Sequence, residues 1–161
     1  MPRVTRSSKK TPQNDLSINW TAKRRRMLTS RFSNVPYPNW LGLKIARLSA
    51  GHAELSIAIQ ENHQQYQGIA HGGVLASLAD TAATFAALTI IPESTDVVTI
   101  EFKVNFLAAA PSGTLVAKGR TVRVGSRVAV SDVEVHGPKK DRLVMTGTFT
   151  RLVFPKPDAY K

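Results

Sequence analysis

The chain has 161 residues, of which 42% are hydrophobic, and it contains no cysteine. This length is typical of a single domain with a buried core, and the lack of cysteine excludes disulfides, a thiolate nucleophile and a cysteine-bound metal. No apolar run approaches the roughly 20 residues that span a bilayer, and the N-terminus has no apolar segment typical of a secretory signal. We therefore expect a cytoplasmic protein with no membrane span.

The formal net charge of +11 is concentrated at one end of the chain. Residues 1–31 hold nine Lys or Arg and one acid, Asp15, for a charge of +8, whereas residues 32–161 carry only +3. The charge therefore belongs mainly to a basic arm, predicted over residues 1–39. We interpret the arm as a solvated tail, so that nucleic-acid binding is not expected. Contact with RNA, a membrane or an acidic partner, or organelle targeting, is the alternative.

Within the arm, the sequence predicts little regular structure. Residues 1–16 are polar and lack periodicity, which predicts disorder. Apolar residues spaced over 18–32 predict a short amphipathic helix that Ser17 or Asn19 would cap. Prolines then predict a loop over 36–38.

The domain is expected over residues 40–154, followed by a tail over 155–161. Its predicted elements are strands over 41–50 and 52–60, a helix over 71–91, and strands over 98–106, 114–124, 127–136 and 142–153. Gly125 and Ser126 predict a two-residue hairpin turn, and a slip in the alternation between Val130 and Val133 predicts a β-bulge.

The order β-β-α-β-β-β-β predicts how these elements assemble. The last connections are too short for crossovers, so the sheet must be largely antiparallel. The helix is rich in alanine and apolar on almost every side, which requires close wrapping by the rest of the domain. We therefore predict an α+β fold in which an antiparallel sheet curls around one long central helix.

Residues 71–80 carry the strongest indication of chemistry. His71, Gly72 and Gly73 stand at the predicted start of the helix, and Asp80 is a lone carboxylate among alanine and leucine. A bare backbone N–H at a helix N-terminus is a ready donor for a developing oxyanion. A carboxylate in apolar surroundings is costly unless chemistry needs it there. Together these features indicate acyl transfer.

The layout resembles the hot-dog fold thioesterases, and within them the PaaI-like acyl-CoA thioesterases of the phenylacetate pathway. The resemblance covers residues 40–153, and its motifs are Gly68-Ile69-Ala70-His71-Gly72-Gly73, Leu78-Ala79-Asp80-Thr81-Ala82, Val98-Thr99, Pro111-Ser112-Gly113 and Gly147-Thr148-Phe149. It implies hydrolysis of acyl-CoA thioesters, no cofactor, and a site shared between two subunits of a dimer or a dimer of dimers.

The resemblance also implies roles for particular residues. Asp80 corresponds to the nucleophile or general base, and Gly72 to the donor whose N–H binds the thioester carbonyl. Gln65 stands where the phenylacetate-pathway members mostly have Asn, a residue that orients the carbonyl or the attacking water. Thr99 is the nearest match to a water-binding Ser or Thr on the next strand, although alternation places it on the face opposite the apolar residues.

Helix geometry leads independently to a shared site. Gly72 and Asp80 are eight residues apart, about 12 Å along a helix axis, whereas a nucleophile must come within about 3–3.5 Å of the carbonyl carbon. If both act on one thioester, they come from two copies of the chain. Asp80 has no Lys or Arg one turn away, so Ser77 and Thr84 are its expected partners. The alternative is a structural carboxylate at an exposed helix edge, bonded to Thr84.

Two further groups are assigned to substrate binding. His71 is expected to brace the glycine turn together with Gly73, rather than to titrate in the reaction. Three arginines surround the predicted hairpin turn, and arginine is a natural partner for the phosphates of CoA. The resemblance favours Arg127 with Gly125, because similar family members often carry a glycine and a basic residue at this hairpin; a solvated basic hairpin is the alternative. Lys139 and Lys140 are weaker candidates. The other histidines, His52, His63 and His136, lack metal-ligand spacing, and no metal is expected.

Two other functions are alternatives to hydrolysis. The first is a non-catalytic acyl-CoA-binding or regulatory hot-dog module that contacts DNA through the basic arm. About 40 residues ahead of the domain are few for a helix-turn-helix unit, which needs two packed helices. The second is a hot-dog hydratase or dehydratase, which expects a catalytic histidine and fits the paired glycines and the acid within the helix poorly.

Overall fold

The computed structural model describes residues 20–138 and 142–156. Its elements in chain order are α1 (Ala22–Ser33), α2 (Pro36–Trp40), β1 (Lys44–Ser49), β2 (His52–Ile59), the 3₁₀ turn η1 (Glu61–His63), α3 (Gly72–Leu88), β3 (Thr95–Phe106), β4 (Gly113–Val124), β5 (Val128–His136) and β6 (Leu143–Pro155). The predicted succession of two strands, a long helix and four strands is confirmed. Within the described ranges, no helix is long and apolar enough to cross a membrane.

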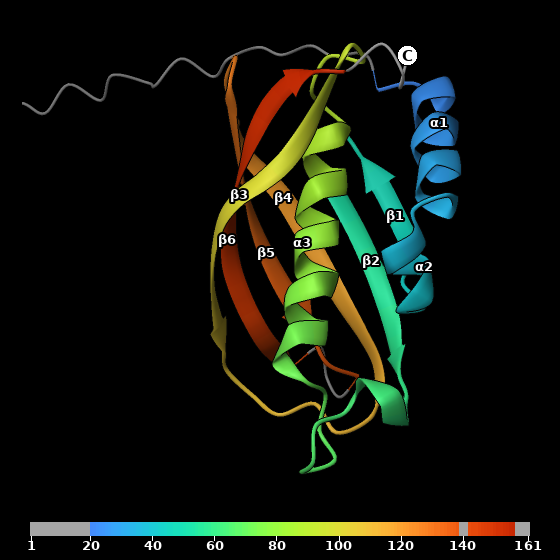
Figure 1. Cartoon of the computed structure of the whole chain (residues 1–161), viewed down its shortest axis with the longest axis vertical. Helices are drawn as coiled ribbons and strands as arrows, with labels where there is room; N and C mark the ends of the chain where they lie inside the picture. Colours follow the sequence, from blue (N-terminus) through green and yellow to red (C-terminus); the bar gives the residue numbers. More distant parts are fainter. Residues whose placement is uncertain (1–19, 139–141, 157–161) are drawn as a thin grey trace, which may run out of the picture.

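The six strands form one sheet in the order β1-β2-β4-β5-β6-β3. Every neighbouring pair is antiparallel, and the sheet curls around α3 (Figure 1). The helices α1 and α2 lie on the side of β1, and β3 forms the opposite edge of the sheet. The predicted α+β architecture, an antiparallel sheet around a central helix, is confirmed.

Small residues allow α3 to lie directly on the strands. Ala79, Ala82 and Ala83 are fully buried. A Cβ atom on Gly119 of β4 would lie 2.8 Å from the carbonyl oxygen of Ala82, so only a glycine permits this approach without a shift. The strands thus pack directly against the helix backbone, and this packing fixes the positions of the polar side chains of α3 relative to the sheet.

The N-terminal helices pack onto the domain. α1 is capped by Thr21, whose Oγ1 accepts the Arg24 N–H at 3.1 Å. It therefore begins later than predicted, and Ser17 and Asn19, the expected caps, lie outside the described residues. The expected loop over 36–38 is the helical turn α2, because proline is tolerated in the first turn of a helix.

One buried arginine ties α1 to the end of α3. The Arg24 guanidinium donates to the carbonyl oxygen of Leu88 at 2.7 Å and to that of Ile91. Without it, two buried carbonyl groups at the C-terminus of α3 would lack partners. We expect Arg24→Ala to lower the free energy of unfolding by about 1–3 kcal/mol, and the exposed neighbour Arg25→Ala to change it by less than about 0.5 kcal/mol. Urea denaturation measures both, and equal losses would show that the Arg24 contacts contribute nothing.

Four of the five strand pairs contain a register shift, and two of these shifts bear on the predictions. The bulge predicted in β5 is wrong: β5 alternates regularly, and the register shift lies in its partner β4, between Thr121 and Arg123. A second shift lies in β3, between Thr99 and Glu101, so that Ile100 is the extra residue. Such a bulge reverses which side chains face the helix on either side of it.

Candidate functional site

An open hollow of about 780 Å³ lies at the N-terminus of α3. It brings together three of the predicted site residues, Gln65, His71 and Gly72. The rest of its lining is largely apolar, namely Tyr66, Ile69, Ala70, Leu75, Phe106, Leu107, Ala108, Ala109 and Ala110. Such a hollow, apolar with a few polar groups at one end, is typical of a small-molecule site.

The start of α3 offers one backbone donor to this hollow. His71 is the N-cap, and its Nδ1 accepts the Gly73 N–H at 2.9 Å, so the expected bracing role of His71 is confirmed. The Gly72 N–H has no acceptor among the described residues, as expected in the first turn of a helix. A Cβ atom at Gly72 would lie 3.0 Å from Cζ of Phe106, so the Phe106 ring, which also lines the hollow, lies close to the glycine backbone.

Gln65 is held by a tight turn ahead of the helix. Its N–H donates to the Ile69 carbonyl at 2.9 Å, and its own carbonyl accepts the Gly68 N–H at 2.9 Å. The side-chain Nε2 donates to Oε1 of Gln67 at 2.9 Å. The Gln65 amide therefore stands at the edge of the hollow and can exchange its side-chain bond for one to a ligand.

Asp80 lies halfway along α3 and faces β3 and β6. Its Oδ1 accepts the Thr99 hydroxyl at 2.7 Å and Nη2 of Arg151 at 3.2 Å. The expectation that Thr99 faces away from the apolar side is wrong, because the extra residue Ile100 changes the alternation of β3. Phe102 stacks on the core residue Phe149, with ring centroids 5.3 Å apart, so Thr99 and Phe102 face the same side of the sheet.

Arg151 is the residue that sequence reasoning missed. It is fully buried on β6, where its Nε donates to Oγ1 of Thr84 at 3.2 Å. The expected partners Ser77 and Thr84 do not bond Asp80. The Ser77 hydroxyl donates to the Gly73 carbonyl at 2.8 Å, and the Thr84 hydroxyl accepts from Arg151. Strand alternation places Arg151 on the same face of β6 as the buried residues Phe149 and Val153. A charged residue on that face was the available signal.

Within a single chain, the Gly72 N–H and the Asp80 carboxylate lie far apart. Gly72 lines the hollow at the start of α3, whereas Asp80 lies eight residues further along the same helix and does not line it. The half-exposed Asp80 side chain instead reaches the surface near the β3 edge of the sheet. The two groups can act on one substrate only if a second copy supplies one of them.

The arginine hairpin lies at the other end of the sheet from the hollow (Figure 1). The connection has three residues rather than the predicted two, since β4 ends at Val124 and β5 begins at Val128. It is closed by a bond from the Gly125 N–H to the Val128 carbonyl at 2.7 Å. The Arg127 side chain is exposed, whereas Arg120 is engaged with Asp132 at 3.3 Å. Lys139 and Lys140 lie outside the described residues.

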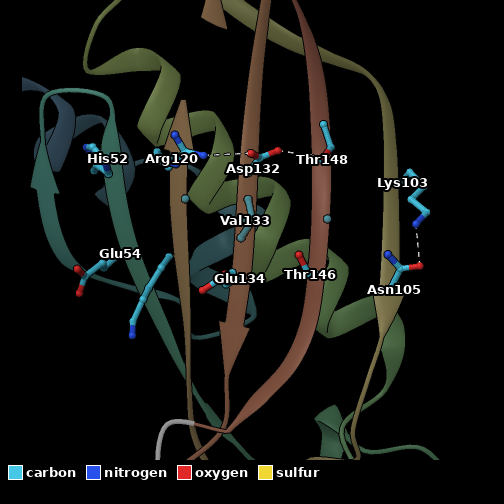
Figure 2. A pocket seen from close by; sticks show the side chains of 13 residues that line it. His52, Glu54, Lys103, Asn105, Arg120, Asp132, Val133, Glu134, Thr146 and Thr148 are labelled. Atoms are coloured by element: carbon cyan, nitrogen blue, oxygen red, sulfur yellow. Dashed lines mark hydrogen bonds and ion pairs between the residues drawn. The ribbon is translucent and has the colours of Figure 1, made fainter. Parts of the chain in front are cut away.

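A second hollow, of about 520 Å³, lies on the outer face of the sheet, away from α3 (Figure 2). It contains none of the predicted site residues. Within it, Asp132 accepts from Arg120 at 3.3 Å and from Thr148 at 3.0 Å, and Lys103 donates to Asn105 at 2.8 Å. No group of His, Asp or Glu suited to hold a metal occurs among the described residues.

Comparison with known proteins identifies the family. The thioesterase superfamily model matches residues 67–146. A Halobacterium salinarum protein, by its name a presumed esterase, is 36% identical over 105 residues, 62% of this chain and 69% of that protein. The 1,4-dihydroxy-2-naphthoyl-CoA hydrolase of Listeria monocytogenes is 27% identical over 95 residues, 59% of this chain and 77% of that enzyme.

A solved structure agrees with these sequence relatives. A point mutant of the phenylacetic acid degradation protein PaaI from Thermus thermophilus superposes with a TM-score of 0.67 at 29% identity, over 73% of this chain and 98% of that one. The resemblance to PaaI-like hot-dog proteins is thereby confirmed. The chain belongs to the thioesterase superfamily and is a thioester hydrolase.

Proposed function

We propose that the chain hydrolyses acyl-CoA thioesters as a homodimer with two equivalent sites, each built from Gly72 and Gln65 of one subunit and Asp80 of the other. One observation carries this proposal. The free Gly72 N–H and the Asp80 carboxylate stand on one helix, too far apart for a single thioester, although each is arranged for its part in acyl transfer.

The exposed edge of β3 supports a dimer. This edge strand is 12 residues long and presents Val98, Ile100 and Phe102, each about half exposed, to solvent. A long edge strand that exposes apolar side chains is a template for pairing with another chain. Antiparallel pairing of two β3 strands about a two-fold axis would bring the Phe106 end of one strand beside the Thr95 end of the other. The hollow of one subunit would then approach the partner's Asp80.

In such a site the reaction follows from the groups present. The thioester carbonyl oxygen accepts the Gly72 N–H, which stabilises the oxyanion as negative charge develops on it. Asp80 either attacks the carbonyl carbon directly or removes a proton from a water that attacks. The C–S bond then breaks, and the thiolate of CoA takes up a proton. Gln65 orients the carbonyl or the water, and Thr99 holds the carboxylate.

The substrate is assigned from two features. The apolar lining of the hollow beside His71 and Gly73 suits an acyl or aryl group. Arg127 of the subunit that supplies Asp80, exposed on the hairpin closed by Gly125, suits the phosphates of CoA, because guanidinium groups bind phosphate with paired hydrogen bonds. The Listeria relative named above is a CoA hydrolase, which agrees with this class of substrate.

A thioester panel tests the proposal. Purified protein is assayed for thiol release from aryl-, short-, medium- and long-chain acyl-CoA, and from the best acyl group carried on pantetheine, which lacks the nucleotide phosphates. We expect release from at least one acyl-CoA, and a KM for the pantetheine thioester at least about tenfold higher, equivalent to about 1.4 kcal/mol of lost binding. Light scattering should report a dimer or tetramer. Binding of acyl-CoA without thiol release would favour the non-catalytic module instead.

A further inference from the structure

The Arg151 guanidinium holds Asp80 at two points. Its Nη2 donates to the backbone carbonyl of Asp80 at 2.9 Å and to the side-chain Oδ1 at 3.2 Å, while its Nε donates to Oγ1 of Thr84 one turn further along α3. The Thr99 hydroxyl adds a second donor to Oδ1 at 2.7 Å. No donor reaches Oδ2 among the described residues.

We propose that Arg151 is a positioning residue that fixes the Asp80 carboxylate through Oδ1 and leaves Oδ2 as the oxygen that attacks the substrate or activates water. This inference rests on the proposed function, since it concerns the same site. It goes beyond it by naming which carboxylate oxygen reacts and which residue outside the reaction holds it.

The burial of Arg151 supports a role beyond stability. Its side chain is 0% exposed, whereas that of Asp80 is 37% exposed, so only the arginine is removed from water. Its Nη1 is also buried and has no hydrogen-bond acceptor among the described residues. A buried charged side chain whose donors are only partly satisfied often contributes no more stability than an apolar replacement. The presence of an arginine at this apolar position therefore indicates a function that a hydrophobic side chain could not perform.

The guanidinium is rigid and charged under working conditions. It lies over the Phe149 ring, 5.7 Å from the centroid, which restricts its plane. Burial lowers the pKa of Arg151 to about 10, with Asp80 opposing the shift, so the group stays protonated at neutral pH. A fixed cation with directed N–H groups determines the orientation of a carboxylate more narrowly than an exposed, mobile lysine does.

The other charged groups nearby have their own partners. On β3, the strand that supplies Thr99, Asp96 pairs with Arg31 at 2.7 Å, Glu101 accepts from Thr150 at 3.1 Å, and Lys103 donates to Asn105 at 2.8 Å. Neither α3 nor β6 carries a charged residue besides Asp80 and Arg151. Within the described chain, the orientation of Asp80 therefore depends on Arg151 and Thr99.

A double-mutant cycle on the full chain tests the proposal. Arg151→Met removes the donors and keeps most of the volume. We expect it to lower kcat about 100-fold, the loss that a misplacement of about 1 Å causes, while KM changes less than about threefold. Arg151→Lys should lose only about tenfold, and the exposed Arg47→Met should leave kcat unchanged. In an Asp80→Asn background, Arg151→Met should cause no further loss, because Arg151 acts through that carboxylate.

The outcomes separate this inference from the proposed function. Wild-type kcat in Arg151→Met, or a full additional loss in the Asp80→Asn background, overturns the positioning role while leaving Asp80 in the chemistry. Wild-type kcat in Asp80→Asn alone overturns the proposed function. If Arg151→Met does not fold, Arg151→Lys decides: a lower kcat at unchanged KM supports the positioning role, and wild-type kcat overturns it.

Discussion

Asp80→Asn is expected to lower kcat for acyl-CoA hydrolysis by about 10³-fold or more, with KM nearly unchanged. The amide cannot attack a thioester or accept a proton from water, and general-base or nucleophilic groups contribute losses of this size. Asparagine has the same shape, and its Oδ1 still accepts from Thr99 and Arg151, so the hydrogen bonds that hold α3 to β3 and β6 are retained. Thiol release under single-turnover and steady-state conditions measures the effect.

A matched control separates chemistry from folding. Asp132→Asn makes the same substitution on the outer face of the sheet, where the carboxylate accepts from Arg120 and Thr148. We expect it to keep wild-type kcat. Both variants should retain nearly the thermal midpoint of the wild type. If Asp80→Asn hydrolysed acyl-CoA at the wild-type rate, Asp80 would be a structural carboxylate and the chemistry would lie elsewhere.

The sequence predicts the fold and the start of α3 well because both depend on local patterns. The alternation of apolar and polar residues indicates the strands, and the alanine content indicates a helix that is surrounded by the sheet. The short connections exclude a parallel sheet. The bracing of Gly73 by His71 involves residues two apart, so it too can be read from the chain. Local spacing also places Gly72 and Asp80 too far apart to act together within one chain.

The errors arise where tertiary contacts override local patterns. One extra residue, Ile100, moves Thr99 onto the helix side, and alternation counted along a strand cannot detect a bulge without its partner strand. Arg151 lies 71 residues from Asp80 in the chain, so a search for cations one helical turn away could not find it. The charge of Arg151 on the apolar face of its strand matches the lone charge of Asp80 on the buried helix, and this match was the signal that sequence alone carried.

Gly72→Pro is expected to lower kcat by about 10²–10³-fold, the loss that removal of one oxyanion donor causes. Proline removes the N–H and is tolerated at this position, because Gly72 is the first residue of α3 and its N–H has no helical partner. His71 already has the extended backbone, φ −64° and ψ 138°, that a following proline requires. The helix should therefore form normally.

Gly72→Ala is the matched control for this substitution. It keeps the N–H and introduces the same Cβ atom, which would lie 3.0 Å from Cζ of Phe106. We expect it to lose less than about tenfold in kcat, since it retains the oxyanion donor. Equal losses in the two variants would attribute the effect to crowding at Phe106 and would remove Gly72 from the role of donor.

Mixed dimers of Gly72→Pro and Asp80→Asn determine whether the site is shared. Each chain carries one defect, so a site built within a single chain would leave every mixed dimer inactive. In a shared site, the intact Gly72 of the Asp80→Asn chain meets the intact Asp80 of the Gly72→Pro chain, and one of the two sites is fully wild type. Mixed dimers isolated through two different affinity tags should therefore show about half the wild-type kcat per dimer. Activity no higher than that of either parent would contradict the two-subunit site even if both residues prove essential.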